Sequence, residues 1–295
     1  MDSARAVTFG KFILAAYDMS EPGGDDPLRP PASSTFPDGY DLHGWITMSD
    51  FLLTLAEPVF YGFVAIAREL PFRTVVAIRG TDSWLEVFDD AQAGFMTGEA
   101  ATGYKAGDVD AGFGRIYQTL TVTPADPTIA ATTPEGATFA AQIAHLVRSV
   151  ATKRLVQEVP SIVITGHSLG AALVTLYVVQ NAHTQPEWKP EVFTFASPRV
   201  GDATFVAAYE AGGATTYRIV NRPDVVPQLP WEIWGYLHVE NADPVLIDST
   251  GSVRSSLSCA HALNTYLHVL VTEVALDPEC KPDERDAHLG AKQTL

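Results

Sequence analysis

The chain has 295 residues, 46% of them hydrophobic and 18% charged, and its 35 acidic and 19 basic side chains give a formal net charge of −16. This composition is ordinary for a globular protein and excludes a disordered, collagen-like or coiled-coil chain. The acidic excess disfavours nucleic acid and anionic membrane surfaces as partners, because both expose phosphates. A neutral small molecule or an emulsified neutral ester, with transient contact to its interface, remains compatible with this charge.

No apolar run reaches the length of about 18 residues that a membrane-spanning helix needs, so we predict no such segment. The first five residues, Met1 to Arg5, show none of the features of a signal peptide. The sequence contains no internal repeat, and we expect residues 1–295 to form one domain.

Hydrophobic periodicity predicts secondary structure along the whole chain. The N-terminal half is expected to contain a helix at 4–17, a Pro- and Gly-rich loop at 21–39, strands at 59–70 and 74–78, a loop at 94–110 and a helix at 138–150. The C-terminal half is expected to contain a strand at 161–165, a buried helix at 171–181, strands at 192–196 and 216–220, late strands or a hairpin at 236–239 and 245–248, and a last helix at 262–276. Strands that alternate with helices predict an α/β fold with a mostly parallel sheet and helices on both faces.

The most informative stretch is 166–170, Gly-His-Ser-Leu-Gly, which lies between a β-branched run and an apolar helix. A Gly-x-Ser-x-Gly sequence between a strand and a helix is typical of a nucleophile elbow. Such a turn needs glycine two residues before and after the serine, because side chains there would collide. Ser168 is therefore the expected nucleophile.

A serine nucleophile needs a base and a group that orients the base. Asp224 follows the strand predicted at 216–220 and is the preferred acid, with Asp202 as the other acid that follows a strand. His261, at the start of the last predicted helix, is the preferred base. His238 and His268 remain alternatives.

Several blocks of sequence, in this order, resemble the class 3 (fungal-type) lipase family of the α/β-hydrolase superfamily. The blocks are Arg-Gly-Thr-Asp at 79–82, Gly-Phe at 112–113, Gly-His-Ser-Leu-Gly at 166–170, Phe-Ala-Ser-Pro-Arg-Val-Gly-Asp at 195–202, Asn-Arg-Pro-Asp-Val-Val-Pro at 221–227, and His261 with Tyr-Leu-His at 266–268. The resemblance implies an α/β-hydrolase fold for this chain.

The resemblance also implies a catalytic triad of Ser168, Asp224 and His261, and an oxyanion hole formed by Thr81 and by the backbone amide of Leu169. It further implies an amphipathic lid at 83–91, for which an ordinary surface helix is the alternative. The family usually has a histidine two residues before the Gly-Phe pair, where this chain has Asp110. The family pattern does not account for the inserts at 20–40 and 94–108.

The expected function is the hydrolysis of carboxylic esters, as a triacylglycerol lipase or carboxylesterase, through an acyl-enzyme on Ser168. A feruloyl-type or polyester esterase of the same mechanism and a catalytically silent, lipase-like binding module are the alternatives. No cofactor and no metal are expected, since no clustered Cys/His ligand spacing or phosphate loop occurs. The family resemblance favours secretion. Cys259 and Cys280 either form one disulfide or stay reduced.

Overall fold

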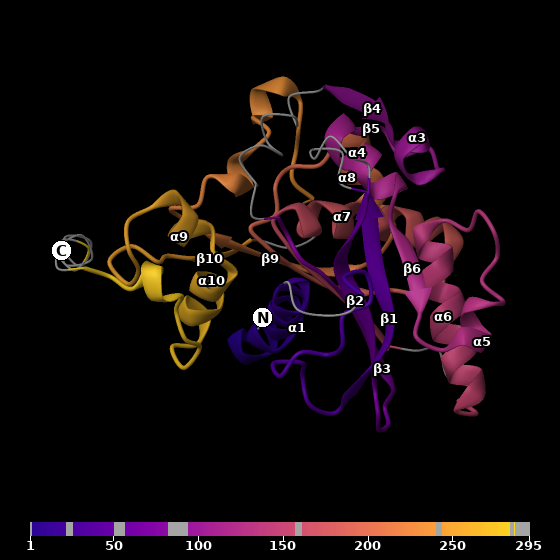
Figure 1. Cartoon of the computed structure of the whole chain (residues 1–295). Helices are drawn as coiled ribbons and strands as arrows, with labels where there is room; N and C mark the ends of the chain where they lie inside the picture. Colours follow the sequence, from indigo (N-terminus) through magenta and orange to yellow (C-terminus); the bar gives the residue numbers. More distant parts are fainter. Residues whose placement is uncertain are drawn as a thin grey trace.

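The computed structural model describes residues 2–21, 26–49, 57–81, 94–156, 161–239, 244–283 and 286. Its main sheet has eight strands in the order β10-β9-β8-β7-β3-β2-β1-β6 (Figure 1). Their bounds are β1 Tyr40–Ser49, β2 Pro58–Ala67, β3 Arg73–Ile78, β6 Thr121–Pro124, β7 Ser161–His167, β8 Glu191–Phe195, β9 Thr215–Asn221 and β10 Val245–Ile247.

The sheet has a parallel part and an antiparallel part. The strands β3, β7, β8, β9 and β10 pair in parallel, whereas β6, β1, β2 and β3 pair antiparallel. The predicted α/β-hydrolase fold with a mostly parallel sheet is confirmed. The carboxyl ends of the parallel strands therefore meet at one edge of the sheet, where ligands bind in open α/β sheets.

Helices cover both faces of this sheet (Figure 1). One face packs against α1 (Ser3–Ser20) and α10 (Leu263–Leu270), the other against α4 (Ala111–Gln118), α6 (Phe139–Lys153), α7 (Leu169–Thr184) and α8 (Ala203–Ala211). Alternation along the strands separates the two cores: in β3, Val75 faces the first and Val76 the second. Every residue of α7 from Leu169 to Asn181 is buried, as expected for a helix that is apolar all round.

Most predicted elements are confirmed within one to four residues, but three predictions are wrong. The expected loop at 94–110 contains β4 (Phe95–Thr97), α3 (Gly98–Thr102) and β5 (Asp108–Asp110), in which β4 and β5 form a ribbon. These elements are too short to show a hydrophobic period; they are fixed by contacts such as the bond from the Gly98 amide to the Gly107 carbonyl.

The other two corrections concern the C-terminal part. Of the late strands or hairpin expected at 236–239 and 245–248, the strand at 245–248 is confirmed as β10, which pairs in parallel with β9. The segment 236–239 is not a strand, since Leu237 forms only an isolated bridge to Gly201, and the two segments form no hairpin. The last helix ends at Leu270, since Val271 adopts an extended backbone. Sequence analysis also did not predict the strands β1 and β6 or the helices α4 and α8. Further elements that it did not predict are the short helices α5 (Pro127–Ala130) and α9 (Leu257–His261) and the 3₁₀ turns at Val226–Gln228, Glu232–Trp234 and Pro278–Cys280.

The two inserts and the lid region have different outcomes. The part of the 20–40 insert that is described after α1, residues 26–39, contains no helix or strand, as predicted. The expected lid at 83–91 lies outside the described residues. Within the described ranges, no helix combines the length and apolar character needed to cross a bilayer.

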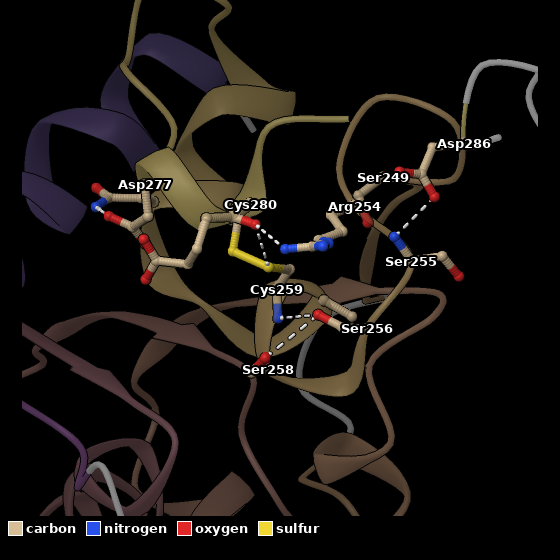
Figure 2. The surroundings of a disulfide bond; sticks show 12 residues. Ser249, Arg254, Ser255, Ser256, Ser258, Cys259, Asp277, Cys280 and Asp286 are labelled. Carbon is tan, nitrogen blue, oxygen red and sulfur yellow. Dashed lines mark hydrogen bonds between the residues drawn. A yellow bond between two sulfur atoms is a disulfide. The ribbon is translucent and has the colours of Figure 1, made fainter. Parts of the chain in front are cut away.

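A disulfide joins Cys259 of α9 to Cys280, across a sequence separation of 21 residues (Figure 2). The two Cα atoms are 5.2 Å apart, a distance that suits a disulfide. The Arg254 amide also donates to the Cys280 carbonyl at 2.9 Å. The question that the sequence left open is thus settled in favour of the bridge, which attaches the C-terminal segment to α9.

We predict that the double variant Cys259→Ser, Cys280→Ser unfolds more easily than the wild type. Removing a crosslink over a loop of this length restores about 3 kcal/mol of chain entropy to the unfolded state, which for a domain of this size lowers Tm by about 5 °C. Calorimetry should detect the change, and wild type with reducing agent is the matched comparison. An unchanged Tm would contradict a stabilising role of the bridge.

Candidate active site

Ser168 lies at a sharp turn between the end of β7 and the start of α7, with φ 56° and ψ −123°. The left-handed φ is unfavourable for a residue with a side chain. A Cβ on Gly166 would lie 2.6 Å from the carbonyl carbon of Gly170, and a Cβ on Gly170 would lie 2.3 Å from the Ile78 oxygen. Both positions therefore require glycine, as the sequence motif predicts.

Three side chains from distant parts of the chain form one hydrogen-bonded series at this turn. Ser168 Oγ lies 2.8 Å from His261 Nε2, and His261 Nδ1 lies 2.8 Å from Asp224 Oδ2. All three are buried, with Ser168 fully inaccessible. The structure thus brings together the three residues that sequence analysis preferred.

The alternative acid and bases lie elsewhere. Asp202 caps the N-terminus of α8 by accepting from the Phe205 amide. His238 bonds to the Pro227 carbonyl, and burial lowers its pKa to about 3. His268 bonds to the Val274 carbonyl through Nδ1. Each of these side chains has a structural partner of its own.

The Asp224 carboxylate is fixed by two further donors. The Tyr266 hydroxyl donates to Oδ2 at 2.7 Å, and the Val226 amide donates to Oδ1 at 3.0 Å. Because Oδ2 also accepts the hydrogen bond from His261 Nδ1, the carboxylate is held in a single orientation. Sequence analysis assigned no role to Tyr266, although it lies in a block that resembles the family.

Asn221, at the end of β9, connects Asp224's loop to α9. Its amide nitrogen donates to Ser249 Oγ at 2.9 Å and to the Ala260 carbonyl at 2.8 Å, and its oxygen accepts from the Ser249 amide at 3.0 Å. Asn221 is fully buried. Asn221 therefore fixes the backbone of Ala260, the residue before His261. Sequence analysis did not identify this role of Asn221.

A second series runs behind the serine. The Gly80 amide donates to the Tyr17 hydroxyl at 2.8 Å, Tyr17 lies 2.8 Å from His167 Nδ1, and His167 Nε2 lies 2.9 Å from the His261 carbonyl. A carbonyl only accepts, so His167 carries its proton on Nε2, and Tyr17 donates to Nδ1. Burial holds the pKa of His167 well below its usual value, which keeps the ring neutral. Tyr17 belongs to α1, and no motif points to it.

The two residues expected to stabilise an oxyanion flank Ser168. Leu169 is the first residue of α7 and is buried. Thr81 follows Gly80, where an added Cβ would lie 3.0 Å from the Ser168 Cβ. The turn that carries Thr81 therefore passes directly beside the serine. The donor roles of Thr81 and Leu169 stay predictions.

Asp110, at the position where the family usually has histidine, is fully buried and caps α4. Its Oδ1 accepts from the amides of Gly112 and Phe113, and its Oδ2 accepts from the Tyr236 hydroxyl. Burial raises its pKa to about 6, since desolvation penalises the charged form more than these donors favour it. Among the described residues, no group of three or more His, Cys, Asp or Glu side chains could hold a metal ion.

We predict that Asp110 makes folding stability fall as pH rises from about 4 to about 6. In this window the unfolded carboxyl, with a pKa near 3.8, releases a proton that the folded one keeps. The difference between the two pKa values corresponds to about 3 kcal/mol. The variant Asp110→Asn retains a capping oxygen but does not titrate, so urea unfolding should show it gaining stability over wild type across this window. Asp108→Asn, an exposed change two residues away, should give no such gain; a parallel pH dependence of wild type and Asp110→Asn would contradict the prediction.

The sequence is similar to those of known lipases and phospholipases. A sequence model of the family described as lipase (class 3) matches residues 75–234. The chain is 31% identical over 235 residues to a rice protein (Oryza sativa subsp. japonica) named phospholipase A1-II 4, covering 74% of this chain and 57% of that one. It is 36% identical over 80 residues to a lipase of Rhizopus niveus, covering 26% of this chain and 20% of that one. The chain thus spans little more than half of the first relative and a fifth of the second.

Solved structures show the same fold. The crystal structure of the Lip2 lipase from Yarrowia lipolytica superimposes with a TM-score of 0.62 at 20% identity, covering 94% of this chain and 95% of that one. Because the family match extends over more than half of the sequence and includes the serine turn, the chain belongs to the class 3 lipase family.

Proposed function

We propose that the protein is a serine hydrolase that cleaves carboxylic esters through an acyl-enzyme on Ser168. One observation carries the proposal: the continuous series from Ser168 Oγ through His261 to Asp224, with both distances at 2.8 Å. A serine bonded to an imidazole that is itself oriented by a buried carboxylate is the arrangement that activates a hydroxyl for attack.

In this mechanism His261 Nε2 takes the hydroxyl proton as Ser168 Oγ attacks the ester carbonyl. The resulting oxyanion is stabilised by Thr81 and the Leu169 amide, which is helped by its position at the N-terminus of α7. His261 then gives the proton to the departing alcohol, and Asp224 stabilises the imidazolium in between. Water repeats the cycle and releases the acid.

The proposed substrates are lipid esters, which agrees with the names of relatives as lipases and phospholipases A1. We propose that residues 1–295 act as one domain, with no nucleic acid partner and only transient contact with a lipid interface. We also propose that the protein is secreted; the Cys259–Cys280 bridge supports this, because disulfides persist in oxidising compartments.

We predict that Ser168→Ala lowers kcat on tributyrin by several orders of magnitude and abolishes labelling by a fluorophosphonate, because no other group supplies the nucleophile. Initial rates on tributyrin and triolein emulsions, together with mass spectrometry of the labelled protein, provide the readouts. Ser255→Ala, an exposed serine change, serves as the control. Wild type that neither hydrolyses these esters nor labels would favour the catalytically silent binding module.

We predict that Tyr17→Phe lowers kcat about tenfold with little change in KM, because the phenylalanine leaves the Gly80 amide and His167 Nδ1 without their shared partner. The turn that carries Gly80 and Thr81 is then no longer joined to the His261 backbone by the hydrogen bonds of Tyr17 and His167. Tyr40→Phe is the matched control, since the Tyr40 ring packs against Phe12 and its hydroxyl has no bond within the described residues. A loss of Tm with unchanged kcat would instead assign Tyr17 a purely structural role.

A further inference from the structure

A cavity of about 350 Å³ lies beside His261, between α1 and the C-terminal helices. It is lined by Thr81 and His261, which belong to the proposed active site, and by Asp18 of α1, Asn264 of α10 and Asp277. The cavity therefore extends from His261 and Thr81 to side chains that the proposed hydrolysis does not use.

The lining combines an apolar part, formed by Leu14, Ala262 and Leu263, with a polar part that carries two carboxylates. Asp18 accepts from the Thr35 hydroxyl and Asp277 from the Asn264 amide, yet neither carboxylate forms an ion pair within the described part of the chain. None of the described lining residues is lysine or arginine. The His167 ring, also in the wall, stays neutral because burial holds its pKa well below the usual value.

The position of the cavity relates it to one part of an ester. His261 Nε2 must pass its proton to the departing oxygen, so the alcohol leaves on the side of the imidazole. An acyl chain has no group that could bind the carboxylates of Asp18 and Asp277 or the Asn264 amide in this cavity, whereas an alcohol with polar groups has. The alcohol is therefore the portion that this lining suits.

We propose that this cavity binds the alcohol portion of the ester and prefers alcohols that carry hydroxyl or ammonium groups over plain alkyl alcohols. The inference rests on the proposed ester hydrolysis and names its substrate class more closely. Hydroxyl and ammonium groups satisfy Asp18 and Asp277, while a phosphate-bearing alcohol would be repelled by both carboxylates.

The wall that carries Asp277 is held in place by the disulfide. Asp277 precedes Cys280 by three residues in the sequence and lies on the segment that the Cys259–Cys280 bond attaches to α9 (Figure 2). The Cys280 amide also donates to the Asp277 carbonyl at 2.9 Å. Since α9 ends at His261, one short unit positions both the base and this carboxylate.

The test compares three butyrate esters that differ only in the alcohol: ethyl butyrate, glycerol 1-monobutyrate and butyrylcholine. All are used below their solubility limits, so no interface contributes. Wild type should show kcat/KM about tenfold higher for the glycerol or choline ester than for ethyl butyrate, and the double variant Asp18→Asn, Asp277→Asn should remove most of this preference. If the double variant lowers kcat/KM for the choline ester alone, charge attraction explains the preference. If it lowers kcat/KM for both the choline and the glycerol ester, hydrogen bonding explains the preference. Either result supports the proposal.

Glu135→Gln, an exposed charge removal before α6, is the control and should keep the wild-type preference. Matching circular dichroism and Tm establish that the Asp→Asn protein is folded. Equal kcat/KM for all three esters in wild type, or a preference that survives the double substitution, would overturn the inference. Wild type that hydrolyses tributyrin emulsions but none of these three dissolved esters would overturn this inference alone, whereas wild type that also fails on tributyrin would refute the proposed function.

Discussion

The backbone of Ser168 is the constraint on which the rest of the site depends. A left-handed φ at a residue with a side chain costs about 1–3 kcal/mol and persists only where its surroundings enforce it. Here the Ser168 amide bonds to the Phe195 carbonyl of β8 at 3.0 Å, and Gly166 and Gly170 allow the turn to close against β3. The buried sheet and the buried α7 supply the packing that compensates for this strain.

The remaining groups reach Ser168 because parallel strands end at one edge of the sheet. Asn221 ends β9 and Asp224 follows it, and through the Ala260 carbonyl and the His261 ring they fix the end of α9 from two directions. A buried polar network of this kind is useful only when every member has a partner. Together with His261, the Tyr266 hydroxyl and the Val226 amide give both carboxylate oxygens of the buried Asp224 a hydrogen-bond donor.

Sequence reasoning was most successful where a feature is local. The glycines around Ser168 and the strand before it predict the turn directly, and most of the buried strands and helices show a clear hydrophobic period. It failed for the ribbon at 94–110, whose three-residue strands are stabilised by contacts outside their own span. Tyr17 and Asn221 were missed for a related reason: a tyrosine in an amphipathic helix and an asparagine at a strand end look like ordinary residues until the fold brings them to Ser168.

The place of Tyr17 in the first helix has a consequence for the order of synthesis. Helix α1 leaves the ribosome before the strands of the sheet, yet the face it covers is completed by α10, and Tyr17 meets His167 only once β7 exists. His261 and Tyr266 come later still. A nascent chain therefore carries its serine for about a hundred residues of translation before the base arrives, and the contacts around Ser168 close only when the two ends of the domain meet. Loss of the first twenty residues would leave the serine, histidine and aspartate intact in sequence but would remove Tyr17, the partner shared by Gly80 and His167.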